Sequence, residues 1–179
     1  YYFRCNKNGT FPSLYIKKIE KLGHEVGYHY ECLSACNGDK KKALKLFIKN
    51  LLSFRKVAVC TSVSMHGKPL SPHHNLDLLF DQDLDEFNLK ADAVLSFTEI
   101  ELIYLTDTGG RWNSSSRHNL RDHVGIATTT PLLPNDSEFI KWIEKKRQPF
   151  ILSAHPERWA TSTINYIVAE MRDQISNLV

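Results

Sequence analysis

The stretch that decides the fold is SLYIKKIEKLGHEVGYHYE, residues 13–31, in which a helical pattern gives way to a short strand. A helix is predicted because Ser13 can cap its first turn and Gly23 is a typical stop signal. The apolar residues of this helix share one face: Leu14, Ile16, Ile19 and Leu22. Residues 25–30 then have the length and composition of a strand, so the stretch predicts one helix–strand unit.

Helices and strands alternate in the same way along much of the chain. A strand over residues 1–4 precedes the first helix, and later strands are predicted at 57–65, 93–97, 102–106 and 150–154. Further helices are predicted over 40–53 after Asp39, from Asn135 or Asp136 onward, and over 163–178. Such alternation is typical of an α/β protein with a parallel sheet or barrel.

Length and composition favour an ordinary globular domain. The 179 residues are 42% apolar and 24% charged, which predicts a single domain over 1–179. The net charge of +3 is too small to favour a nucleic-acid partner, and no apolar run is long enough for a membrane span. Because Tyr1 lies in a predicted strand, we expect the domain to be N-terminally incomplete.

The four cysteines, Cys5, Cys32, Cys36 and Cys60, form no C-x-x-C pair. A chain of this length has no need of disulfides, so we expect free thiols and a reducing compartment, the cytoplasm. Two disulfides are the alternative.

Histidines and carboxylates close four of the predicted strands. His29 and Glu31 end the second strand, and His66 ends the third; Asp107 and His155 end two later strands. In parallel α/β proteins chemistry gathers at these carboxyl ends. Imidazole and carboxylate groups suit a divalent metal, most simply zinc. The alternative interpretation is that a residue such as Asp107 caps a turn.

Two Arg–Trp pairs follow the later strand ends and are candidates for binding a sugar ring: Arg111 and Trp112, Arg158 and Trp159. Alternatively, the tryptophans pack beneath long loops. The chain has no glycine-rich phosphate loop and no G-x-S-x-G nucleophile elbow, so neither of those chemistries is indicated.

Several segments of the sequence together resemble the polysaccharide deacetylases of the NodB-homology type (carbohydrate esterase family 4-like). The resemblance is carried by LGHEVGYH at 22–29 and by the strand FILSA at 150–154 with His155, which is similar to the family's closing Leu-x-His motif. More narrowly, residues 23–31, MHGKPLS at 65–71, TDTGGRW at 106–112 and HPERW at 155–159 are similar to a divergent bacterial subgroup found among surface-polysaccharide (O-antigen) gene products.

The resemblance implies a distorted (β/α) barrel that lacks its first strand in this chain, and metal-dependent removal of an N- or O-acetyl group from a sugar. His29 matches the family's first metal-binding histidine, and His155 matches its closing histidine, the general acid. Leu33 stands where the family has its second metal histidine, and the His66–Gly67 loop replaces an Arg-x-Pro loop. The family's paired aspartates would precede Tyr1. We infer, apart from the resemblance, that Glu31 or His66 replaces the lost ligand.

The sequence therefore predicts a metal-dependent hydrolase that removes an acyl group from a carbohydrate, with His155 as acid and Asp107 orienting a histidine. His29, His66 and Glu31 are the predicted metal ligands, with zinc as the expected cofactor and a carbohydrate as the expected partner. Two alternatives remain. One is a non-catalytic carbohydrate-binding or assembly protein, which Leu33 supports; the other is a different metal hydrolase such as a phosphoesterase.

Overall fold

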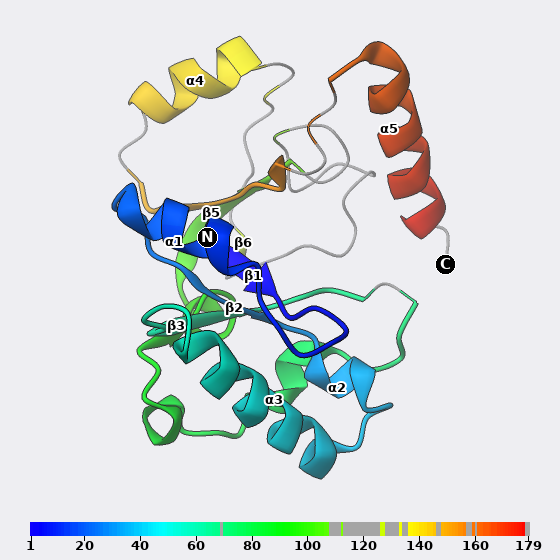
Figure 1. Ribbon diagram of the computed structural model, residues 1–179. Helices are drawn as coiled ribbons and strands as arrows, with labels where there is room; N and C mark the ends of the chain where they lie inside the picture. The colour runs from blue at the N-terminus through cyan, green and yellow to red at the C-terminus, as the bar shows by residue number, and fades with distance from the viewer. Residues whose placement is uncertain are drawn as a thin grey trace. The chain divides into compact units, whose positions relative to one another are not determined.

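The computed structural model describes residues 1–68, 70–107, 112, 126–127, 133, 136–145, 148–156, 159 and 161–177 (Figure 1). The chain divides into two compact units, Tyr1–Ser96 and Phe97–Val179. Each unit has its own parallel sheet and is described by itself below. Among the described helices, none has both the length and the apolar composition that a membrane crossing requires.

The first unit is built on a four-stranded sheet in the order β1-β2-β3-β4, in which every pair of neighbours is parallel. The strands are β1 (Tyr2–Arg4), β2 (Gly27–Tyr30), β3 (Ser62–Met65) and β4 (Ala91–Asp92). The helices between them are α1 (Ser13–Lys21), α2 (Cys32–Ala35) and α3 (Lys40–Arg55), with short 3-10 turns at Asn75–Leu78 and Leu84–Phe87. A further 3-10 turn, Leu95–Phe97, follows β4. This arrangement confirms the predicted α/β class and parallel sheet.

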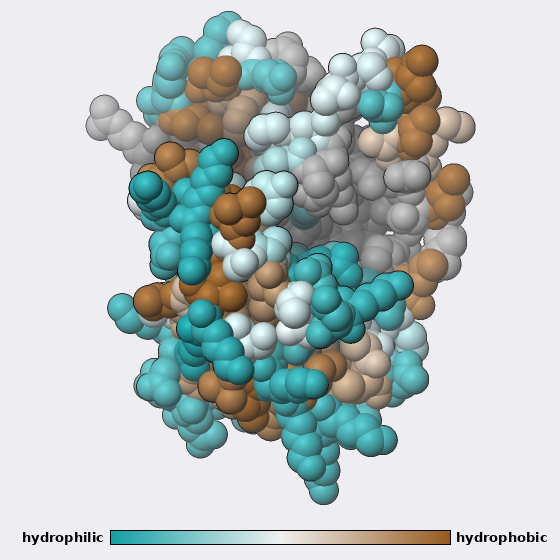
Figure 2. Space-filling model, in the orientation of Figure 1, coloured by the Kyte–Doolittle hydropathy of each residue, from teal (hydrophilic) through white to brown (hydrophobic). Residues whose placement is uncertain are grey.

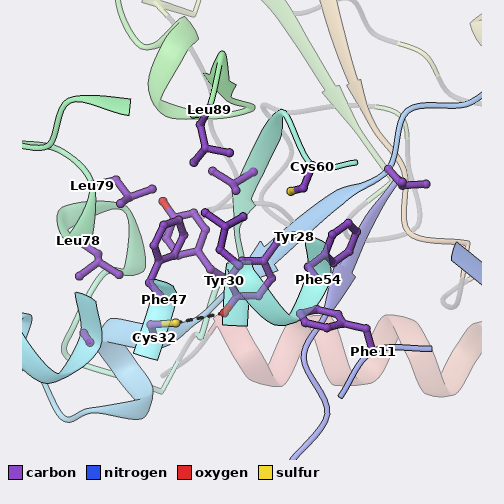
Figure 3. Close-up of a cluster of buried hydrophobic side chains, with 14 of the residues drawn as sticks. Phe11, Tyr28, Tyr30, Cys32, Phe47, Phe54, Cys60, Leu78, Leu79 and Leu89 are labelled. Carbon is purple, nitrogen blue, oxygen red and sulfur yellow. Dashed lines mark hydrogen bonds between the residues drawn. The ribbon is translucent and has the colours of Figure 1, made fainter. Parts of the chain in front are cut away.

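Alternation along β2 gives the sheet one apolar and one polar face. Tyr28 and Tyr30 are buried to 1% and 0% exposure and pack against Phe47 of α3, with ring centroids 5.7 and 5.3 Å away (Figure 3). His29 lies between them in sequence and therefore points to the other face. In register, Arg4 pairs with His29, and His29 pairs with Ser64, so polar residues line up across three strands.

The helix ends follow the sequence signals closely. Gly23 has a φ of +87°, a left-handed conformation that ends α1, and the amide of Gly23 donates to the carbonyl of Glu20. Asp39 caps α3 by accepting from the amide of Lys42 at 3.0 Å, as predicted. The predicted cap of α1 is wrong by one residue, because Ser13 is already helical and Pro12 precedes it.

Two predicted strands of the first unit differ from the structure. The segment 57–65 becomes a strand only at Ser62, because the amides of Val57 and Ala58 still bond to the carbonyl of Phe54 at the end of α3. Residues 93–97 do not form a strand. The Asp92 carboxylate accepts from the amides of Val94 and Leu95 at 2.8 and 3.0 Å, which bends the chain into a 3-10 turn.

The second unit is built on a three-stranded parallel sheet in the order β6-β5-β7. Its strands are β5 (Glu101–Thr106), β6 (Ile126–Ala127) and β7 (Phe150–Ser153), and its helices are α4 (Asp136–Lys145) and α5 (Thr163–Asn177). Leu105 and Phe139 belong to its small core. Of the two predicted starts of α4, Asn135 lies outside the described residues.

The described strands pair within two separate sheets, and none of their pairings closes a barrel. The distorted barrel therefore stays a prediction, as does the single domain over 1–179. The four cysteines are free thiols in the structure, with Cys32 and Cys60 buried in the core.

Candidate functional site

In the first unit, the carboxyl ends of β1, β2 and β3 bring four polar side chains together. Nη2 of Arg4 donates to Oε2 of Glu31 at 2.8 Å. Nδ1 of His66 lies 3.1 Å from the same carboxylate oxygen. His29 lies beside His66, with ring centroids 5.0 Å apart and the ring planes nearly perpendicular. We call Arg4, His29, Glu31 and His66 the first polar group.

Hydrogen bonding orients the ring of His29. Its Nδ1 lies 3.0 Å from the carbonyl oxygen of Ser64 on the neighbouring strand. A carbonyl only accepts, so Nδ1 carries the proton and donates it. In the neutral ring, Nε2 then carries the lone pair through which an imidazole binds a metal ion.

A buried amide fixes the backbone at His66. Asn75 is 2% exposed, and its Nδ2 donates to the His66 carbonyl oxygen at 2.8 Å and to the Ser34 hydroxyl at 3.1 Å. Its Oδ1 accepts from the Ser34 amide at 3.0 Å. On the other side, the His66 amide donates to the carbonyl of Tyr30. The backbone of His66 is thus bonded directly to β2 and, through Asn75, to α2. These bonds are independent of the contact between its side chain and Glu31.

The first polar group offers the right chemistry for a metal ion. Two imidazoles and one carboxylate are ordinary zinc ligands. Within the described residues, however, no set of three or more His, Cys, Asp or Glu side chains converges on one point. Leu33 is 3% exposed and belongs to the apolar core, so this position, which the sequence resemblance matches to a metal-binding histidine, contributes no ligand.

In the second unit, Asp107 and His155 form a tight pair after β5 and β7. The pairing of Thr106 with Ser153 places both residues just beyond the paired strand ends. Oδ1 of Asp107 lies 2.7 Å from Nδ1 of His155, and Oδ2 accepts from the His155 backbone amide at 2.7 Å. Oδ2 also accepts from Nε1 of Trp159 at 2.8 Å. We call Asp107, His155 and Trp159 the second polar group.

This bonding keeps Asp107 ionised. Burial of the side chain raises the pKa of the Asp107 carboxyl, but the hydrogen bonds from His155 and Trp159 outweigh burial and hold the pKa below its usual range. At neutral pH the carboxylate therefore accepts the Nδ1 proton of His155. The Nε2 atom of His155 is left as the position that can gain or lose a proton.

The predicted sugar-binding residues have different surroundings. Trp159 is 58% exposed and bonded to Asp107, so its ring faces solvent beside the pair of Asp107 and His155. Trp112 stacks on Phe139 with centroids 4.3 Å apart, and its Nε1 donates to Asp136 at 3.0 Å. That packing favours the alternative interpretation of Trp112 as a structural residue. Arg111 and Arg158 lie outside the described residues.

Neither Arg4, which belongs to the first polar group, nor Asn75, which supports it, was identified from the sequence. Arg4 stands at the end of β1, two residues after Tyr2, and the strand-end pattern that singled out His29 could have found it too. Asn75 follows a polar loop, and nothing in its sequence neighbourhood distinguishes it from a solvent-exposed amide.

Comparisons of this chain with protein-family models, curated proteins and solved structures found no match. The resemblance to polysaccharide deacetylases therefore rests on the sequence segments alone.

Proposed function

We propose that the protein is a metal-dependent hydrolase that removes an acyl group, expected to be acetyl, from a carbohydrate. The observation that carries this proposal is the pair of Asp107 and His155, whose Oδ1 and Nδ1 atoms are 2.7 Å apart. A histidine held at Nδ1 by an ionised carboxylate has a fixed ring and a defined proton-carrying atom.

In this proposal His155 protonates the leaving amine or alkoxide from Nε2. Asp107 is a positioning residue, because it acts through His155: its carboxylate fixes the tautomer and stabilises the imidazolium. The Trp159 ring is 58% exposed beside this pair and offers an apolar surface for a sugar ring.

We place the proposed metal ion at the first polar group. We propose His29 and His66 as nitrogen ligands and Glu31, which must share its carboxylate with Arg4, as the oxygen ligand. If bound there, a divalent ion, expected to be zinc, would supply Lewis-acid polarisation of the acyl carbonyl and a bound water of pKa about 7. The Ser64 carbonyl keeps His29 in the tautomer that this role requires.

The direct test measures acetate release from a panel of acetylated sugars, together with the metal content of each variant. His155→Ala should lower kcat by about 10²–10⁴-fold while its metal content stays at the wild-type level, because general acid catalysis contributes that much. His29→Ala should lose the metal. The matched control is His24→Ala, since His24 packs edge-on against Tyr1, with centroids 5.1 Å apart, and does not belong to either polar group.

Normal turnover in metal-stripped protein would contradict the proposal, as would full activity in His155→Ala. Generic phosphoesters serve as comparison substrates, and their exclusive hydrolysis would indicate a phosphoesterase instead.

A second candidate function is a carbohydrate-binding protein without catalysis. The observation that favours it is the burial of Leu33 together with the engagement of Glu31 by Arg4, which leaves few groups to hold a metal. It predicts glycan binding by a protein that holds no metal and releases no acetate, which separates it from the hydrolase in the same experiment.

A further inference from the structure

The first unit contains a cavity of about 450 Å³, whose lining includes His29 and Glu31 of the first polar group together with residues that the proposed chemistry does not use. It lies where β1 ends, between the turn that follows β1, the end of β2, and helices α2 and α3. In Figure 2 hydrophilic residues gather over this part of the surface. The volume falls in the range of pockets that hold small-molecule ligands.

The charges on the cavity wall are unbalanced. Arg4, Lys7 and Lys49 line it, and the one carboxylate in the lining is Glu31. Glu31 is bonded to Arg4 at 2.8 Å, so these two charges neutralise each other. Among the described residues, no carboxylate lies within 4.0 Å of Lys7 or Lys49. Within the part of the chain that the structure describes, these two lysines therefore have no carboxylate counter-ion at that distance.

Lys49 lines the cavity together with Cys5, the residue that follows β1. Burial raises the pKa of the Cys5 thiol, and the positive charge of Lys49 opposes that rise. The side chain of Lys49 projects from α3, whereas Lys7 comes from the turn after β1, so the two charges approach the cavity from different elements.

The cavity wall is fixed by hydrogen bonds. In the turn, Oδ1 of Asn8 accepts from the amide and the hydroxyl of Thr10 at 3.2 and 2.6 Å. The Ser53 hydroxyl of α3 donates to the carbonyl of Gly9 at 3.1 Å and ties the turn to the helix. Asn50 lines the cavity while 7% exposed, and its Nδ2 donates to the Tyr28 hydroxyl at 2.9 Å.

We propose that this cavity binds a phosphoryl group, in particular that of a sugar phosphate. A phosphate monoester is a dianion at neutral pH and matches the two uncompensated lysines, whose ammonium groups bind phosphate oxygens as point charges. The volume exceeds what a phosphate fills and leaves room for the sugar that carries it. This inference concerns binding alone, lies wholly within the first unit, and does not rest on acyl removal.

The test titrates the full 179-residue chain with inorganic phosphate, a hexose 1-phosphate, the neutral hexose and a hexuronate, at constant ionic strength. Amide chemical shifts of residues 6–9 and 49–50 report on the cavity. The expected result is saturable binding of both phosphates, tighter for the hexose 1-phosphate, with weaker binding of the hexuronate. Lys7→Gln and Lys49→Gln should each weaken phosphate binding by about tenfold, because each removes one close charge.

Lys45→Gln is the matched control, since Lys45 lies one turn before Lys49 on α3 and does not line the cavity. Its phosphate affinity should stay within about twofold of wild type, because a distant exposed charge is largely screened. The proposal is overturned if the Lys45 variant loses as much affinity as the Lys49 variant, if neither Lys7 nor Lys49 matters, or if hexuronate binds as tightly as phosphate.

Discussion

Asp92 is a titratable residue in the apolar part of the first unit. Its side chain is 0% exposed at the end of β4. The carboxylate accepts from the Tyr30 hydroxyl at 2.8 Å and from the amides of Val94 and Leu95. Burial raises the pKa of Asp92, and these hydrogen bonds reduce the rise without cancelling it.

Replacing Asp92 should change how stability depends on pH. In the wild type the folded state holds the Asp92 proton more tightly than the unfolded state, whose pKa is about 3.9. The contribution of Asp92 to stability is therefore greatest below that value and falls as pH rises through the folded pKa. Asp92→Asn removes this dependence, so its free energy of unfolding relative to wild type should improve from pH 4 to pH 7.

Urea unfolding at the two pH values measures this difference. Asp77→Asn is the control, because Asp77 is exposed in a 3-10 turn and should leave the wild-type pH dependence unchanged. A pH-independent difference between Asp92→Asn and wild type would show that the raised pKa is wrong.

At the residue scale, the sequence predicted where the candidate site residues lie better than it predicted which residues they contact. His29 and His155 were identified because strand ends can be located from the strand pattern. That pattern did not show that Ser64 fixes the tautomer of His29, or that Trp159 shares the carboxylate of Asp107 with His155. Such partners come from elements distant in the chain, and one-dimensional periodicity carries no information about them.

Among the elements, α3 contributes most to the core of the first unit. Its buried residues follow the helical repeat, and they are Ala43, Phe47, Asn50, Leu51 and Phe54. Phe47 is 0% exposed and makes edge-on contacts with Tyr30 and Phe87. This helix is therefore the element through which the tyrosines of β2 are held in place.

Truncation of Phe47 should destabilise the first unit strongly. Phe47→Ala removes a buried ring and leaves a cavity, which costs about 3–5 kcal/mol. Leu52→Ala, on the same helix and 55% exposed, should cost less than about 1 kcal/mol. Denaturant unfolding followed by circular dichroism compares the two variants. Equal losses would mean that α3 does not pack as described.

The helices were easier to predict than the short strands. The apolar repeat of α3 and its cap at Asp39 are local signals, and the predicted helix over 40–53 corresponds to the observed Lys40–Arg55. β4 has only two residues, and its end is set by the Asp92 side chain, which bonds to the backbone ahead of it. Propensity alone favoured a strand over 93–97, and that side-chain bond overrode it.

For the whole molecule, the chain divides into two units with separate cores. The larger core gathers residues from Phe11 to Leu89, all within the first unit. The second unit has a smaller cluster around Leu105 and Phe139. Because a domain needs its own apolar core to fold alone, the first unit has what independent folding requires.

We therefore expect a fragment of residues 1–96 to fold without the rest of the chain. It should give dispersed amide resonances and a cooperative thermal transition, because its sheet and core lie within it. A spectrum typical of an unfolded chain would show that the first unit depends on residues after Ser96.

The sequence predicted the α/β class and its parallel strands, but it could not show whether the strands close into a barrel. Alternation of helix and strand is a local pattern, and it correctly predicted parallel pairing. Whether two sheets join into a barrel depends on hydrogen bonds between strands far apart in the chain, and the hydrophobic pattern of a strand is the same in either case.

The parallel pairing also affects how the chain is made. Ile103 of β5 pairs with Phe150 of β7, which leaves the ribosome much later. Until β7 has been synthesised, the edge of β5 that pairs with it has no partner strand. In the finished protein, however, residues 102–106 are almost completely buried. Unpaired apolar strands invite aggregation during synthesis. We therefore expect chaperones to bind the nascent chain mainly in the interval between synthesis of β5 and of β7. Pulse labelling in cells measures this binding.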